Sequence, residues 1–421
     1  MTYENTLEFA RRMDADDPLR HFRSRFLFPQ HKGADVRYFC GNSLGLQPAS
    51  VRSYIGQELD DWARYGVEGH FHGTHPWLSY HKMFAEPLSR LVGAYPHEVV
   101  AMNSLTVNLH LMMVSFYRPT ESRWKIICEA GAFPSDQYAL ESQVRCHGLY
   151  PDDTIVELSP RDGEFTLRNE DIMQAIADHA DSLALVMMPG VQYYTGQVFD
   201  MERITAEAHA AGAYAGLDLA HAAGNIELRL HDWGVDFATW CSYKYLNSGP
   251  GGVSGAFVHE RHGNNPDLPR FAGWWGNDES ERFFMRKGFR PARGAEGWQL
   301  SNAPVLSMAA HKASLDIFDE AGMPAIARKR TMLTGFLEFV VDEASARQSG
   351  GFRIITPRNP AERGCQISLL TGGNGRELFT SLTESGIIVD WREPNVIRAA
   401  PAPLYNSFED VWHLGQALQG R

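Results

Sequence analysis

Short apolar runs alternate with stretches of helical periodicity through the middle of the chain. Runs rich in β-branched and aromatic residues predict strands at 124–128, 154–158, 183–188, 213–218 and 237–241. Between them, residues 169–179 and 201–211 carry apolar positions at the spacing of amphipathic helices. Alternation of this kind predicts an α/β fold, with a mainly parallel sheet covered by helices on both faces.

Helices are also expected before this region. The first residues predict a helix capped by Asn5 or Thr6, and residues 50–65 predict a second one. Residues 105–117 are apolar nearly all round, so we expect a buried helix there, capped by Asn103 or Ser104. A short strand is expected at 36–40.

The last quarter of the chain has a different pattern. Residues 307–344 look helical, strands are expected at 352–355, 365–370 and 387–390, and a final helix begins at Phe408. We therefore predict three parts: residues 1–60, which pack with the small domain, a large domain at 61–305, and a small α+β domain at 306–421.

Composition narrows the function classes. The formal net charge is -12, from 39 basic and 51 acidic residues, and no basic stripe stands out, which argues against a nucleic-acid or anionic-membrane partner. The start of the chain lacks the apolar core of a signal peptide, and runs such as 183–188 are too short to span a bilayer. The five cysteines form no CxxC pair, which favours reduced core thiols in a cytoplasmic protein.

A lysine and an aspartate carry the clearest chemical signal. Lys244 follows the strand at 237–241 and precedes a glycine-rich turn, and desolvation there favours the neutral amine that forms a Schiff base. Asp218 ends the preceding strand, with His221 just after it. A lysine that binds an aldehyde and an acid that pairs with a pyridinium nitrogen suit pyridoxal phosphate. The alternatives are a surface lysine and a helix-capping aspartate.

Two loops and a helix start are candidate ligand contacts. The loop at 41–48 contains Ser43, and the helix start at Thr106 suits a phosphate, although plain connections and caps have similar sequences. Phe133 could cover a planar ring, or simply pack in the core. Three histidines lie within residues 70–75, but their spacing fits no metal motif, so we favour an imidazole that hydrogen-bonds a substrate over a metal site.

Several segments spread over nearly the whole chain resemble the kynureninase family. They are YFCGNSLGLQP (38–48), MNSLTVNLHLMM (102–113), AFPSDQYALESQ (132–143), GVQYYTGQ (190–197), LDLAHAAGN (217–225), YKYLNSGPGG (243–252) and APLYNSFED (402–410). The resemblance implies a fold-type I, aminotransferase class V-like enzyme that uses pyridoxal 5'-phosphate. It also implies a cytoplasmic homodimer with shared active sites, acting in tryptophan catabolism by the kynurenine pathway, with a link to NAD biosynthesis. The implied reaction cleaves the Cβ–Cγ bond of L-kynurenine or 3-hydroxy-L-kynurenine to an anthranilate and L-alanine.

The same resemblance implies a site residue by residue. The cofactor-binding set is Leu105, Thr106, Phe133, Pro134, Ser135, Asp136, Asp218, His221, Tyr243, Lys244, Trp274 and Asn302. The substrate-binding set is Ser43, His70, Asn302 and Arg398. Lys244 would form the Schiff base, Tyr243 would donate a proton, and Arg398 would pair with the substrate carboxylate. Trp274 and Asn302 would reach the site of a neighbouring subunit.

Two positions depart from the family pattern. Asn277 stands where animal enzymes carry a histidine, and Pro189 where a hydroxyl is common, whereas His70, Ser301 and Asn302 match the hydroxykynurenine-preferring arrangement. The preferred substrate ring therefore stays open.

The rival functions are another enzyme of the same fold type, an aminotransferase or a cysteine desulfurase, and a catalytically silent scaffold. Cys365 lies in an apolar, strand-like run, which disfavours a desulfurase nucleophile. The presence of Lys244, Asp218 and Arg398 together argues against the scaffold.

Overall fold

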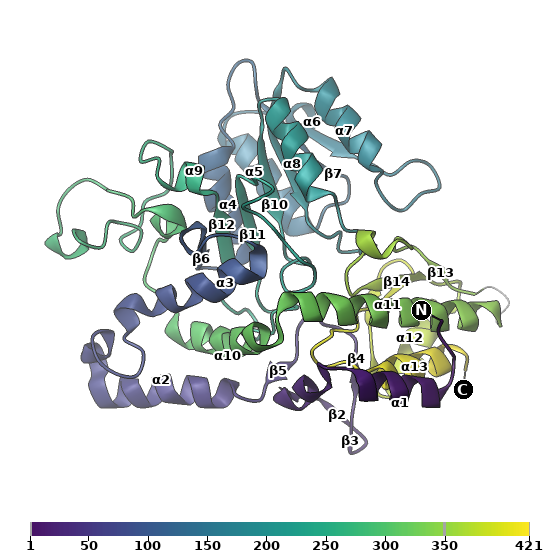
Figure 1. Ribbon diagram of the computed structural model, residues 1–421. Helices are drawn as coiled ribbons and strands as arrows, with labels where there is room; N and C mark the ends of the chain where they lie inside the picture. The colour runs from purple at the N-terminus through teal and green to yellow at the C-terminus, as the bar shows by residue number, and fades with distance from the viewer. Residues whose placement is uncertain (1, 348–350, 421) are drawn as a thin grey trace.

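A seven-stranded sheet forms the centre of the computed structural model, which describes residues 2–347 and 351–420 (Figure 1). The strand order is β6-β12-β11-β10-β9-β7-β8. The strands are β6 (Val99–Ala101), β7 (Lys125–Glu129), β8 (Ile155–Leu158), β9 (Leu183–Pro189), β10 (Tyr214–Asp218), β11 (Phe237–Trp240) and β12 (Gly255–Val258). The run from β8 to β11 is parallel, and β12 is antiparallel to both of its neighbours.

The five strands predicted for this sheet are confirmed, and two more are added. Their apolar runs are continuous because both faces are buried: in β9, Val186 and Met188 enter one core, while Leu185 and Met187 enter the other. β6 and β12, which are three and four residues long, were not among the predicted strands.

Helices cover the sheet on both faces. They are α3 (Ala85–Val92), α4 (Leu105–Phe116), α5 (Pro134–Cys146), α6 (Pro151–Thr154), α7 (Asn169–Asp178), α8 (Met201–Ala210), α9 (Glu260–Gly263) and α10 (Val305–Ala321). α4 and α5 supply one core, and α3, α7, α8 and α10 supply the other. The 264–304 segment projects from the left of the molecule in Figure 1. Within it the structure has two short 3₁₀ turns, Arg282–Phe284 and Gly294–Trp298.

The C-terminal part is built on a four-stranded sheet of order β13-β14-β17-β16. Its elements are α11 (Met323–Ala346), β13 (Arg353–Ile354), β14 (Ile367–Leu370), α12 (Gly375–Glu384), β15 (Ile387–Ile388), β16 (Asp390–Arg392), β17 (Val396–Ala399) and α13 (Phe408–Leu418). The helical stretch predicted at 307–344 is two helices, because Gly322 between α10 and α11 has φ +73°, which breaks the helix.

The N-terminal segment packs partly with this C-terminal part. α1 (Leu7–Asp16), capped by Thr6, lies beside α13, and Phe9 shares a core with Val340 and Phe408 (Figure 1). β4 (Arg37–Tyr38) pairs with β15. By contrast, α2 (Val51–Tyr65) packs against α10. The three-part domain division stays a prediction.

The remaining elements are short. The strands are β1 (Phe26–Leu27), β2 (Gln30–His31), β3 (Ala34–Asp35) and β5 (Gln47–Pro48). Further 3₁₀ turns span Arg20–Arg25, Gly66–His70, Trp77–Phe84, Pro96–Glu98 and Pro360–Glu362. None of the described helices combines the length and apolar character needed to cross a membrane. The cysteines are free, and Cys146 on α5 is exposed, so the expectation of core thiols holds for the other four.

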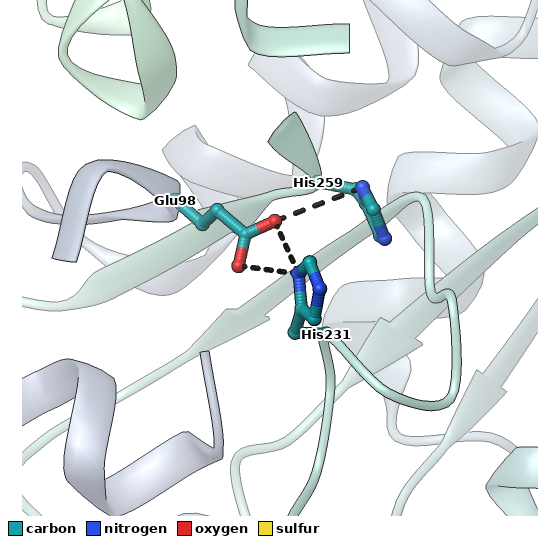
Figure 2. A group of neighbouring side chains, drawn as sticks. All are labelled: Glu98, His231 and His259. Atoms are coloured by element: carbon teal, nitrogen blue, oxygen red, sulfur yellow. Dashed lines mark hydrogen bonds and ion pairs between the residues drawn. The ribbon is translucent and has the colours of Figure 1, made fainter. Parts of the chain in front are cut away.

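A buried glutamate ties together three segments at the amino ends of the parallel strands. Figure 2 shows the Glu98 carboxylate facing the rings of His231 and His259. Glu98 is fully buried, and His231 Nδ1 lies 3.0 Å from Oε1. Its two oxygens also accept main-chain N–H groups of Tyr95 at 2.8 Å and Glu260 at 2.7 Å. Because these donors already satisfy the carboxylate, the geometry is that of a structural staple.

Candidate active site

A cavity of about 220 Å³ lies at the carboxyl ends of the parallel strands, where ligands bind in sheets of this type. Asp218 is the last residue of β10, and Lys244 lies in the turn four residues beyond β11. Of the predicted cofactor-binding residues, the cavity is lined by Leu105, Thr106, Phe133, Ser135, Asp136, Asp218, His221, Tyr243 and Lys244. Residues up to 139 positions apart in the sequence, 105 and 244, thus share one cavity.

Lys244 has a defined set of neighbours. Its Nζ lies 3.0 Å from Nε2 of His221 and 5.6 Å from the centre of the Phe133 ring. Burial, followed by the charge of Lys244, lowers the pKa of His221 well below its usual range. The imidazole is therefore neutral and accepts a hydrogen bond from Nζ. Among the described residues His221 Nδ1 has no hydrogen-bond partner.

Two acids meet in the same cavity. Asp218 is buried, and its Oδ1 accepts the main-chain N–H of Ala220 at 2.7 Å. Asp136, in the first turn of α5, forms a side-chain hydrogen bond with Asp218. Burial raises the pKa of both carboxyl groups. The pair therefore shares a proton and provides both a donor and an acceptor for a polar ligand atom.

The start of α4 forms an end of the cavity that suits an anion. Ser104 occupies the N-cap position, but its side chain caps no amide, and Asn103 before it adopts φ +48°. The first amides of the helix, at Leu105 and Thr106, therefore lack a side-chain cap where they line the cavity. The positive end of the helix dipole and these N–H groups attract a negative charge.

Arg398 and Ser43, both predicted to bind substrate, lie together beside this cavity. Arg398 is fully buried on β17, donates to the Tyr193 carbonyl at 2.5 Å and lies 3.3 Å from Ser43 Oγ. It also forms an ion pair with Asp390 on β16. Ser43 and Asp390 line an adjoining cavity that shares Phe133 and Tyr193 with the first one.

Sequence reasoning missed one acid in the site. Glu129 lines the cavity, is buried, and ends β7. Burial, followed by the charge of Asp218, raises its pKa to about 8, although a hydrogen bond from Gln192 acts the other way. The signal was present, because an acid at the carboxyl end of a parallel strand is the pattern that identified Asp218.

Comparison with known proteins identifies the family. A kynureninase of Flavobacterium psychrophilum is 56% identical over 419 residues, and the match covers 100% of this chain and 99% of that kynureninase. A kynureninase of Myxococcus xanthus is also 56% identical, covering 99% and 98%. This chain belongs to the kynureninase family. The family model of the kynureninase C-terminal domain matches residues 326–418.

Solved structures give the fold of this kynureninase-family chain. A cysteine desulfurase from Thermococcus onnurineus is similar with a TM-score of 0.73 and 18% identity, covering 100% and 99% of the two chains. A cysteine desulfurase from Escherichia coli is similar with a TM-score of 0.75 and 18% identity, covering 96% of this chain and 98% of the other. The predicted fold class, the fold-type I architecture, is thereby confirmed.

Besides Ser43 and Arg398, four residues of the kynureninase pattern lie outside the cavity in this single chain. Pro134 lines the adjoining cavity, and His70 packs its ring against Trp77 at 5.5 Å and donates to the Val67 carbonyl. Trp274 and Asn302 are exposed, and Trp274 Nε1 donates to the carbonyl of Arg282 at 3.1 Å. Their roles in binding stay predictions, and those of Trp274 and Asn302 involve a second subunit.

The positions that bear on the rival functions also have clear surroundings. Cys365 is fully buried, just before β14 rather than within a strand, and burial raises the pKa of its thiol to about 12. A thiol so placed is a poor nucleophile, as expected. Pro189 lines the cavity, and Asn277 accepts the main-chain N–H of Arg290 at 2.9 Å in the long loop.

Proposed function

We propose that this protein is a pyridoxal 5'-phosphate-dependent kynureninase. It hydrolyses the Cβ–Cγ bond of L-kynurenine or 3-hydroxy-L-kynurenine and releases the corresponding anthranilate and L-alanine. The observation that carries the proposal is the meeting of Lys244, His221 and Asp218 in one cavity at the carboxyl ends of neighbouring strands. Full-length relatives at 56% identity support the same reaction.

The residues present fit the cofactor. Asp218 and Asp136 suit a protonated ring nitrogen, because a buried carboxyl group in the cavity can accept the N–H of a pyridinium. The uncapped amides at the start of α4 suit the phosphate, and Phe133 suits the face of the ring. Bound to Lys244, the group supplies an electron-withdrawing ring that stabilises negative charge developing on the substrate carbons.

Lys244 holds the cofactor and then moves a proton. Once the substrate amine has replaced it, Nζ is free to take the proton from the substrate α-carbon. His221 Nε2, at 3.0 Å, accepts a hydrogen bond from this amine and orients it. Arg398 binds the α-carboxylate, and a guanidinium matches a planar carboxylate in both shape and charge.

Tyr243 is the proposed proton donor to the substrate β-carbon. Burial raises the pKa of its phenol, so the side chain stays protonated at neutral pH. It lines the cavity one residue before Lys244. Water adds to the aryl ketone and the acyl group leaves as the anthranilate, and a protonated phenol can then supply the proton that the β-carbon needs to become the methyl group of alanine.

The active unit is proposed to be a cytoplasmic homodimer acting in tryptophan catabolism. Exposed aromatic side chains gather in the long loop, at Phe271, Trp274, Phe283 and Phe284. Such a group on one surface favours contact with a second copy. Trp274 would then reach the neighbouring cavity.

The test is turnover and cofactor absorbance of the purified protein. Wild type should consume kynurenine or 3-hydroxykynurenine, whereas Lys244→Ala should lose the absorbance band of lysine-bound cofactor and more than about a thousandfold of turnover. Lys125→Ala is the matched control, because Lys125 lies at the end of β7 away from the cavity, and this variant should keep both the absorbance band and turnover. Turnover retained in Lys244→Ala would remove this lysine from catalysis.

A further inference from the structure

Two arginines and one aspartate form a cluster beside the active-site cavity. Asp390 on β16 lies directly opposite Arg398 on β17, and Arg392 follows two residues later on β16. Asp390 Oδ2 forms the ion pair with Arg398, accepts from Ser43 Oγ at 2.5 Å and lies 3.4 Å from Nη2 of Arg392. One carboxylate oxygen is thus shared by three donors.

The cluster carries an unbalanced positive charge. Two guanidinium groups face a single carboxylate, which leaves a formal charge of +1. The surroundings do not cancel this charge: burial raises the pKa of Cys40 to about 12 and keeps it neutral, and Glu393 is paired with Arg376 at 3.2 Å. Arg398 is fully buried, so water screens the charge poorly at this residue, whereas the Arg392 side chain is 38% exposed. The cluster is therefore built to receive one more anion.

The positive charge of the cluster affects a residue inside the active-site cavity. Arg398 and Arg392 both contribute to the low pKa of His221, the residue that contacts Lys244. Phe133 and Tyr193 line both the active-site cavity and the adjoining one that contains Arg392. An amino acid joined through its amine at the Lys244 position would carry its α-carboxylate on this side.

We propose that Arg392 is a positioning residue that acts through Asp390. By attracting Asp390, it prevents that carboxylate from fully neutralising Arg398, and Arg398 can then take the α-carboxylate of the substrate. Without Arg392, the substrate would have to displace a neutral, buried ion pair. The inference rests on the proposed function, in which Arg398 binds that carboxylate.

The test compares three variants of the cofactor-loaded enzyme. Arg392→Gln should raise the KM for L-kynurenine about tenfold and leave kcat within about twofold, because Lys244 and Tyr243 are untouched. Arg392→Lys keeps the charge and should restore most of the loss. Arg376→Gln is the control: this arginine lines the same adjoining cavity but pairs with Glu393, so KM should not change.

A second readout separates charge from general packing. Inhibition by kynuramine, which lacks the α-carboxylate, should be equal in wild type and Arg392→Gln. Any of three results would overturn the role of Arg392. The KM could stay unchanged in Arg392→Gln, or Arg376→Gln could raise it as much as Arg392→Gln does. Inhibition by kynuramine could also weaken in Arg392→Gln by the same factor as the KM rises. Wild-type protein that leaves both kynurenine and 3-hydroxykynurenine intact would instead overturn the proposed function.

Discussion

Glu129 shows how strongly one buried position changes the chemistry of a side chain. It lies in the active-site cavity with two further acids, and burial raises its pKa to about 8. In the unfolded chain a glutamate titrates near 4.3. Between these two values the unfolded chain releases a proton that the folded protein keeps. The stability of the cofactor-free protein therefore falls as the pH rises through this window.

Replacing Glu129 should remove this pH dependence. In Glu129→Gln the side chain is neutral in the folded and in the unfolded protein. The thermal stability of this variant relative to wild type should therefore improve steadily from pH 5 to pH 8. Unfolding temperatures of the cofactor-free proteins measure the effect. Glu170→Gln, exposed on α7, is the control. Parallel pH curves for Glu129→Gln and wild type would mean that Glu129 is ionised in the folded protein.

At the scale of elements, the Glu98 staple holds the sheet at the end opposite the active site. Its carboxylate joins the turn before β6, the start of α9 and the segment before β11 through His231 (Figure 2). Each partner is a partly buried hydrogen-bond donor that would otherwise lack this acceptor. The staple therefore acts on stability, away from the reacting atoms.

Glu98→Gln should lower the free energy of unfolding by about 2 kcal/mol, because an amide cannot accept all of these hydrogen bonds. Cofactor absorbance and kcat of the folded protein should stay near wild type. Glu260→Gln is the control and should change little, because the half-exposed Glu260 contacts Glu98 only through its main-chain N–H. Treatment with a chelator should leave the unfolding temperature of wild type unchanged; a clear drop would indicate a metal ion held by Glu98, His231 and His259.

At the scale of the whole molecule, completion of the active site is proposed to need a second copy. Trp274 is about half exposed and lies outside the cavity of its own chain. The same exposed loop carries Phe283 and Phe284. A shared site of this kind makes catalysis a property of the dimer rather than of one chain.

Mixing two inactive variants tests this sharing. In a mixed dimer of Lys244→Ala and Trp274→Ala, one site combines Lys244 of one chain with Trp274 of the other. Unfolding and refolding the two proteins together should therefore recover about a quarter of wild-type activity. Refolding each variant alone is the control. No gain over the average of the two would place the complete site within a single chain.

Much of the fold was readable because it rests on local patterns. The apolar runs of β7 to β11 register as strands because both of their faces are buried, whichever partners they have. Asp218 and the turn with Lys244 followed from their places at strand ends. The residues that carry the kynureninase resemblance added the remaining members of the site. Glu129 had the same strand-end signal and was still overlooked.

What the sequence by itself determined is the parallel strands β7 to β11 of the large sheet and several of its helices, the family, and the residue types at the carboxyl edge of that sheet. The tertiary structure alone decided which polar groups pair by hydrogen bonds or as ions. These are Asp136 with Asp218, Lys244 with His221, and Arg398 with Asp390 and Ser43. These pairings depend on strand register and on contacts between distant segments, and Ser43 and Asp390 are 347 positions apart. A local sequence pattern does not show which distant segments come into contact. Burial and neighbouring charges, which set the protonation state of each group, arise from those contacts.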